Sequence, residues 1–156
     1  MSADFNTSIK VVGSKEGIVK ILETLKYYEN ERYDQYCKGE PYVDYLEFVY
    51  VAEGKKYNQK KAKRLEDIED ITQYVDELKK GEIAVDAMGP YGRGFATLDE
   101  IDLFKDIADK LDNDVEFEGT SYGFNNAGRQ TLSVEYKNGK LEIDFEFDDD
   151  DDDEDC

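Results

Sequence analysis

Six carboxylates in the last third of the chain recur at the spacing of alternate residues in β-strands. They occupy three stretches that alternate acidic with apolar residues, and they are Glu116, Glu118, Glu135, Glu142, Asp144 and Glu146. Alternate residues of a strand point to the same face and lie about 6.8 Å apart. Every second phosphate along one DNA strand is separated by roughly 7 Å. Carboxylates on such strands can therefore present a line of negative charges that resembles a nucleic-acid backbone.

The composition excludes several other kinds of chemistry. The chain has 156 residues and contains neither His nor Trp. Nucleophilic systems in which His activates Ser or Cys need an imidazole, as do His-ligated zinc sites. Two cysteines, Cys37 and Cys156, are too few for a Cys₄ zinc site or a disulfide framework, and they favour a reducing cytoplasm. We therefore expect a protein that is not an enzyme and that uses no metal or cofactor.

A hydrolase that uses paired carboxylates is the alternative from a different functional class. General acid–base catalysis by Asp and Glu needs no histidine, but one of the two groups must have a pKa shifted by burial. No acidic pair in the sequence is marked in this way.

A stretch at 112–116 begins like a calcium-binding loop, but Phe117 and Gly123 occupy the positions where that loop needs Gly and Glu.

The net charge of −19 is distributed unevenly along the chain. Residues 1–64 carry +2, residues 65–147 carry −13, and residues 148–155 add −8. The terminal run repels itself and has no apolar residue to bury, so we expect one domain over 1–147 and a disordered acidic tail over 148–156. The tail could contact the basic stretch 55–64 weakly and in a salt-sensitive way. Direct binding to nucleic acid is disfavoured by repulsion, and no apolar run is long enough to span a membrane.

Hydrophobic periodicity indicates the elements that must position the carboxylates. It predicts strands over 5–12, 42–51, 83–87, 114–118, 132–136 and 141–147, and helices over 15–38, 65–80 and 98–111. Asn138-Gly139 predicts a type I′ hairpin that sets Glu135 opposite Glu142, which costs stability because like charges face each other. The order of elements predicts an α+β two-layer sandwich. It has a mixed sheet of about six strands, three helices mainly on one face, and an antiparallel hairpin at the C-terminus.

Aromatic residues are the second class of candidate contact. Tyr33 and Tyr36 lie among charged residues late in the first predicted helix, and Tyr and Arg are the residue types that anchor protein interfaces. The glycine-rich loop 89–95 carries Tyr91 and Arg93 but lacks the Lys of a phosphate-binding loop. We interpret it as a turn whose tip can contact a partner. The basic run 60–64 fits a nuclear-localisation pattern, but we interpret it as the lead-in to a helix.

In size, acidity and lack of catalytic machinery the whole chain resembles the DNA-mimic inhibitors of phages and mobile elements, such as anti-CRISPR and anti-restriction proteins. The resemblance implies a non-enzymatic inhibitor that binds a basic, nucleic-acid-binding protein such as a CRISPR effector or restriction nuclease. The six carboxylates would then replace phosphates, and the tyrosines would anchor the complex. Two alternatives in the same class stay open: an immunity protein that neutralises a nuclease toxin, and a histone-chaperone-like acidic protein.

Overall fold

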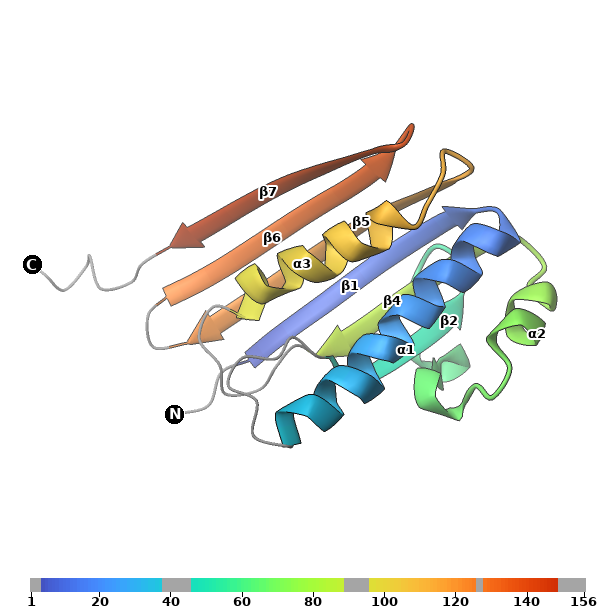
Figure 1. Cartoon of the computed structure of the whole chain (residues 1–156), viewed down its shortest axis with the longest axis horizontal. Helices are drawn as coiled ribbons and strands as arrows, with labels where there is room; N and C mark the ends of the chain where they lie inside the picture. The colour runs from blue at the N-terminus through green and yellow to red at the C-terminus, as the bar shows by residue number, and fades with distance from the viewer. Residues whose placement is uncertain (1–3, 38–45, 89–95, 126–127, 149–156) are drawn as a thin grey trace, which may run out of the picture.

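The structure is a computed structural model that describes residues 4–37, 46–88, 96–125 and 128–148. Seven strands form one sheet in the order β3-β2-β4-β1-β5-β6-β7. The strands are β1 (Asp4–Gly13), β2 (Glu47–Glu53), β3 (Lys63–Arg64), β4 (Glu82–Met88), β5 (Val115–Asn125), β6 (Gly128–Lys137) and β7 (Lys140–Asp148). The helices are α1 (Lys15–Cys37), α2 (Ile71–Asp76) and α3 (Ala96–Asp109). Helices α1 and α3 lie across the same face of the sheet, so the architecture is α+β in two layers (Figure 1).

The predicted mixed sheet is wrong, because every neighbouring pair of strands is antiparallel. Helix α1 connects β1 to β2, yet β4 lies between those two strands. Helix α3 likewise connects β4 to β5, with β1 between them. This is the split βαβ arrangement, in which an intervening strand separates each parallel pair. The alternation of strands and helices along the sequence does not reveal which strand lies between the two strands of each parallel pair.

The second helix is shorter than predicted, and the structure adds one strand. Asp70 accepts a hydrogen bond from the backbone N–H of Gln73 at 3.0 Å, so it caps α2 and starts the helix at Ile71. The apolar residues that suggested a helix from Leu65 onward are nevertheless all buried: Leu65, Ile68, Ile71, Val75 and Leu78. The periodicity therefore identified the buried side of this segment but not its break. The two-residue strand β3, which pairs with β2, brings the sheet to seven strands.

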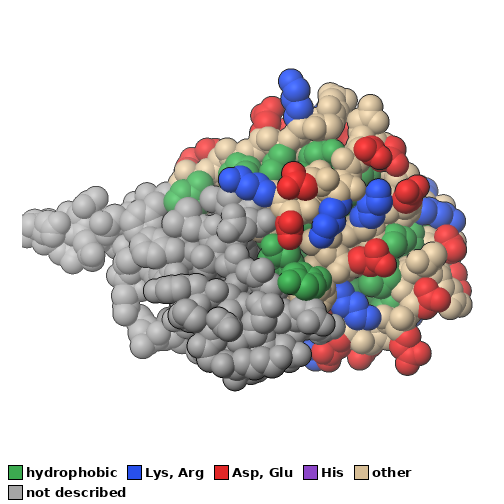
Figure 2. Space-filling model, in the orientation of Figure 1, with side chains coloured by type: hydrophobic (Ala, Val, Ile, Leu, Met, Phe, Trp, Pro, Cys, Tyr) green, Lys and Arg blue, Asp and Glu red, His purple; other side chains and the backbone are tan. Residues whose placement is uncertain are grey.

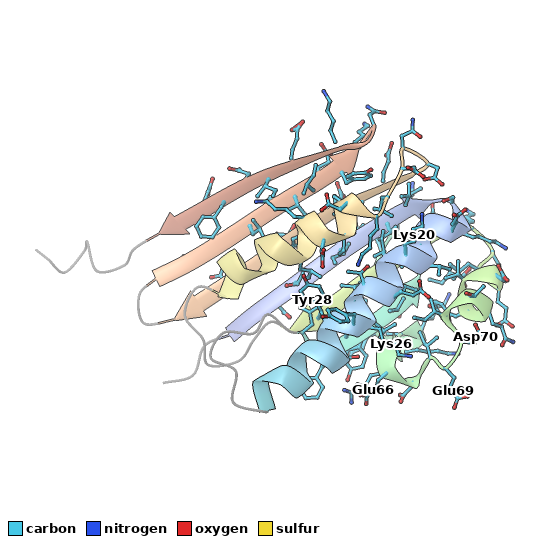
Figure 3. The ribbon with its side chains drawn as sticks, viewed as in Figure 1. Lys20, Lys26, Tyr28, Glu66, Glu69 and Asp70 are labelled. Atoms are coloured by element: carbon cyan, nitrogen blue, oxygen red, sulfur yellow. The ribbon has the colours of Figure 1, made fainter. Side chains whose placement is uncertain are left out.

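Burial of one sheet face by α1 and α3 forms the core. Ser14 caps α1, since its Oγ accepts the N–H of Gly17 at 3.0 Å as its N-cap position predicts. Tyr28 of α1 donates a hydrogen bond to Asp106 of α3 at 3.0 Å and links the two helices (Figure 3). On β1, Ile9 and Val11 are buried beneath the helices, whereas alternate residues of the strand are exposed. The sheet therefore has one dry face and one open face, and the open face is covered only around Ala52 of β2 and Ala84 of β4 among the described residues.

An aromatic stack joins α3 to the C-terminal strands. The ring of Phe117 lies between those of Phe104 and Tyr136, with centroid distances of 6.2 and 5.5 Å. A Cβ at Gly119 of β5 would lie 3.1 Å from the Phe104 ring, so the glycine gives α3 room to approach the sheet. The Tyr136 hydroxyl donates to the carbonyl of Leu111 at 3.0 Å. This contact fixes the chain just after α3 to β6.

A buried carboxylate of α1 holds the irregular start of β2. The register of β2 against β4 shifts between Glu47 and Tyr50, and Phe48 has a φ of 51°. Glu29 is 7% exposed, its Oε2 accepts the N–H of Val49 at 3.1 Å, and its Oε1 has no hydrogen-bond partner among the described residues. Burial raises the pKa of Glu29 above its usual value, and the Val49 hydrogen bond opposes that rise.

We predict that Tyr136→Phe lowers the free energy of unfolding by about 1–2 kcal/mol, because it removes a buried hydroxyl donor from the Leu111 carbonyl and keeps the ring. Chemical denaturation measures the change. Tyr122→Phe is the matched control because Tyr122 is 47% exposed on β5, and it should change stability by less than about 0.5 kcal/mol. Equal effects of the two substitutions would contradict the role given to the Tyr136 hydroxyl.

We predict that Glu29 makes the chain less stable as the pH rises. Because the folded-state pKa of Glu29 is raised, its contribution to stability is complete below its ordinary pKa of 4.5 and is lost as the pH rises through the raised value. Glu29→Gln cannot titrate, so its stability should fall less than that of the wild type between pH 4.5 and neutral pH. Urea denaturation across this range measures the difference. Glu23→Gln, at an exposed position of the same helix, should keep the wild-type slope.

Candidate functional site

The open face of the sheet carries all six predicted carboxylates, and each of their side chains is exposed. On β5, Phe117 is buried between Glu116 and Glu118. On β7, the half-buried Leu141, Ile143 and Phe145 pack toward the helices and alternate with the three acids. The predicted alternation is therefore confirmed, and it gathers the six carboxylates on three neighbouring strands.

Three of these carboxylates form a row across the strands, which we call the glutamate row: Glu118, Glu135 and Glu142. Glu118 of β5 lies opposite Glu135 of β6, and Glu135 lies opposite Glu142 of β7. The predicted pairing within the hairpin is thus confirmed. Neighbouring strands are about 4.8 Å apart, and like charges directly opposite reduce the stability of a sheet. The glutamate row is a local cost that the rest of the fold must offset.

The open face is not uniformly acidic, which the sequence pattern did not reveal. Lys10 of β1 lies opposite Glu118 on the other side of β5, and Lys137 faces Lys140 beside the hairpin turn. A depression of about 480 Å³ lies between Lys10 and Lys137 beside the glutamates of β5 and β6, and it is also lined by Lys55 and Lys56. Among the six carboxylates, Glu118 is the one to which the strand register gives a facing lysine.

Only one strand presents the line of charges expected of a phosphate mimic. Strand β7 has three successive open-face acids, whereas β5 has two, and on β6 the other described open-face positions carry Arg129, Thr131, Ser133 and Lys137 beside Glu135. The distance between strands, about 4.8 Å, is also shorter than the roughly 7 Å between every second phosphate of one DNA strand. The phosphate-like spacing is therefore a property of β7 and not of the whole surface.

Strand β4 contributes two further acids that already have partners. The hydroxyl of Ser8 donates to Asp86 Oδ1 at 3.3 Å, and Lys55 Nζ lies 3.6 Å from Glu82 Oε2. Burial raises the pKa of Asp86, and the hydrogen bond from Ser8 partly opposes this. These two groups stabilise the open face itself and are less available to a partner than the acids of β7.

Four of the predicted contact residues have side chains that lie outside the residues that the structure describes. Tyr33 and Tyr36 fall within α1, of which only the backbone is described at those positions, and Tyr91 and Arg93 fall within the gap 89–95. The predicted tail 148–156 extends into the undescribed C-terminal residues 149–156, so its contact with the basic stretch also stays a prediction.

The sequence reading missed an exposed aromatic residue on the open face. Tyr122 is 47% exposed on β5. It was missed because the prediction ended this strand near Glu118, whereas the strand runs to Asn125. Thr120 and Tyr122 are of residue types that favour strands, and this signal could have revealed the longer element. This tyrosine lies on the same strand and the same face as Glu118.

The end of the basic run is part of the folded structure. Lys63 Nζ lies 5.9 Å from the centre of the Tyr74 ring, and the Arg64 guanidinium lies 5.0 Å from that of Phe48. Arg64 Nη1 also lies 3.3 Å from Glu66 Oε1. These contacts give the end of the run a structural role, but it forms strand β3 and does not lead directly into a helix as predicted, since α2 begins at Ile71.

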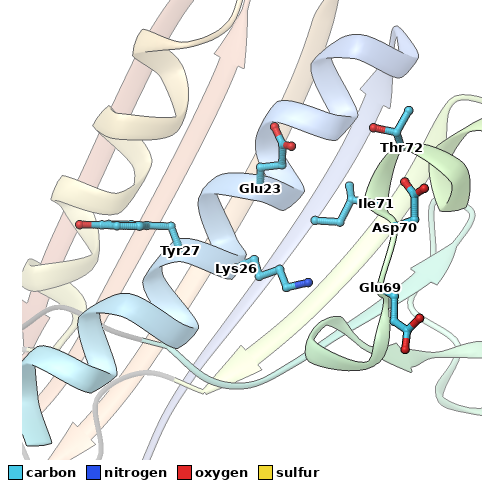
Figure 4. A pocket seen from close by; sticks show the side chains of 7 residues that line it. All are labelled: Glu23, Lys26, Tyr27, Glu69, Asp70, Ile71 and Thr72. Carbon is cyan, nitrogen blue, oxygen red and sulfur yellow. The ribbon is translucent and has the colours of Figure 1, made fainter.

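A second depression, of about 510 Å³, lies on the helix side of the molecule between α1 and residues 69–72. Lys26 extends from α1 toward Glu69 and Asp70, and Tyr27 and Glu23 lie on the same helix (Figure 4). The Lys26 ammonium donates to the Ile68 carbonyl at 3.1 Å, and Asp70 caps α2. Two charged groups that line this depression therefore already have structural partners. Charges of both signs are interspersed on this side (Figure 2). It is a weaker candidate site than the open face.

The described part of the chain was compared with the requirements of a metal site and of a membrane-spanning helix. Among its residues no group of His, Cys, Asp and Glu side chains could hold a metal ion. Asp114, from the stretch that begins like a calcium loop, accepts a hydrogen bond from Ser14 Oγ at 2.6 Å. None of the described helices has the length and apolar character needed to cross a bilayer.

No family model, curated protein sequence or solved structure matches the chain. Its function must therefore be inferred from the chemistry of the open face.

Proposed function

We propose that the chain is a non-enzymatic acidic protein whose open sheet face binds a basic, nucleic-acid-binding protein and inhibits it. The observation that carries the proposal is the set of six exposed carboxylates on three adjacent strands. The glutamate row within it opposes folding, because like charges face each other across two strand pairs. A partner with Lys and Arg side chains at this surface would relieve that repulsion.

Long-range electrostatics favour the same class of partner. A net charge of −19 attracts basic surfaces over distances comparable to the Debye length and raises the rate of association. The same charge repels nucleic acid and anionic membranes. A protein that holds nucleic acid in a basic groove, such as a CRISPR effector or a restriction nuclease in the cytoplasm, would be blocked by a chain that occupies this groove.

The mixed charges beside the glutamate row favour a second candidate. Lys10 and Lys137 border the depression on the open face, so a partner must match charges of both signs to fit there. An immunity protein that neutralises one nuclease toxin would need this kind of selectivity. Its complex should persist at a salt concentration that dissociates a simple polyanion complex.

We predict that the immobilised full-length chain captures a basic nucleic-acid-binding protein from lysates of candidate hosts at about 50 mM salt and loses it by about 200 mM salt. Amide substitutions at all six carboxylates should abolish capture, because they remove the charge and keep the side-chain size. The matched control carries six amide substitutions at exposed acids away from the open face: Glu23, Asp67, Glu69, Glu77, Asp109 and Asp112. Mass spectrometry identifies the proteins retained.

Three other results separate the alternatives. A single partner that resists the higher salt concentration indicates an immunity protein. Equal loss of capture in both sixfold variants shows that net charge alone is responsible, and it contradicts a site on the open face. Turnover of a nucleotide, glycan or ester by the purified chain would establish an enzyme and overturn the proposal.

A further inference from the structure

The two edges of the sheet are built differently. At one edge, β3 has only two residues and is flanked by short helical turns at 59–61 and 65–67. Very short edge strands are a common protection against pairing with another chain. At the other edge, β7 has nine residues and pairs with β6 without a register shift. Since β7 contains neither Pro nor Gly, it presents a long and regular edge that no other described strand covers.

The hairpin turn determines which backbone groups of β7 point outward. Asn138 and Gly139 have φ values of 55° and 76°, as a type I′ turn requires. The hydrogen bond that closes such a turn joins Lys137 and Lys140. Bonded and non-bonded pairs alternate along an antiparallel ladder, so the N–H and C=O groups of alternate residues, among them Leu141, Ile143 and Phe145, point to the free edge.

The side chains at this edge specify the strand that could be added to it. The exposed acids of β7 would lie beside alternate side chains of an incoming strand on the open face. On the opposite face, the half-buried Leu141, Ile143 and Phe145 would lie beside the remaining side chains, next to the core. A segment that alternates basic with apolar residues satisfies both faces.

A second copy of the chain fits this edge poorly. Antiparallel pairing of two β7 strands on one open face would set the acids of one copy against those of the other, and like charges directly opposite are destabilising. Each copy also carries a net charge of −19. The charge of the edge therefore selects a basic strand over self-association.

We propose that the β7 edge binds an extended basic segment of the partner as an eighth strand of the sheet. The backbone of Leu141, Ile143 and Phe145 pairs with this segment, while Lys or Arg side chains of the segment meet Glu142, Asp144 and Glu146. The inference rests on the proposed function and specifies how the partner is held. It is strand addition with specificity from alternate side chains.

Nuclear magnetic resonance of the full chain with a synthetic probe tests this mode of binding. The probe is a nine-residue peptide that alternates Lys with Val. In the free chain we expect fast hydrogen exchange at the amides of Leu141, Ile143 and Phe145, and slower exchange at those of Glu142 and Asp144. At saturating peptide and low salt, the three outward amides should exchange at least about tenfold more slowly.

Matched peptides separate strand addition from simple charge attraction. In antiparallel addition, the pairing that every neighbouring strand pair of this sheet adopts, the Val residues of the probe lie opposite the outward-facing residues of β7. N-methylation of the Val nitrogens should therefore weaken binding at least about tenfold. N-methylation of the Lys nitrogens, which point away from β7, is the control and should have a smaller effect. A Glu–Val peptide of the same length should not bind.

Two triple variants of the chain locate the contact. Amide substitutions at Glu142, Asp144 and Glu146 should weaken binding of the Lys–Val peptide at least about tenfold, whereas those at Glu116, Glu118 and Glu135 should weaken it less than about threefold.

Binding without protection of the three outward amides, or equal binding of both N-methylated peptides, would overturn strand addition and leave the proposed function standing. Absence of peptide binding at low salt would overturn strand addition whatever protein is captured. Failure to capture any basic protein would separately overturn the proposed function.

Discussion

The structure depends on the burial of a single face of the sheet beneath α1 and α3. Crossover connections between parallel strands of one sheet are almost always right-handed. The β1–α1–β2 and β4–α3–β5 connections run in opposite directions and toward opposite edges, so the same handedness places both helices on one face. Strands β1, β5, β6 and β7 then keep a side toward water. A chain in which residues 65–147 carry −13 needs such a side, because ionised carboxylates are costly to bury.

Strands β6 and β7 lie beyond the four strands of the split βαβ unit, and they hold four of the six carboxylates: Glu135, Glu142, Asp144 and Glu146. Their attachment to the core is aromatic, since Tyr136 stacks on Phe117 and its hydroxyl reaches the Leu111 carbonyl. This attachment offsets the repulsion within the glutamate row. The acidic hairpin thus packs on the core through its buried face, while its carboxylates are exposed on the open face.

Local signals in the sequence were sufficient for some features and insufficient for others. The register of the hairpin and the cap at Ser14 follow from a few adjacent residues, and both were predictable. The antiparallel order of the strands and the position of Lys10 opposite Glu118 depend on pairing between distant segments, which periodicity does not encode. The break before α2 was missed because apolar residues continue at helical spacing past Asp70, whose capping contact decides where the helix begins.

The sign of the charges on β7 carries information that their position alone does not. An exposed edge strand needs protection from pairing with copies of itself, and lysines are the usual residues for that purpose. Acids protect equally well against self-pairing, because like charges repel whatever their sign. Lysines at these positions, however, would repel a basic partner and attract nucleic acid. The carboxylates of Glu142, Asp144 and Glu146 therefore disfavour pairing with a second copy of the chain and favour pairing with a basic strand. The acidic side chains of β7 thus favour, for its backbone edge, the same class of partner that we propose for the open face, a basic protein.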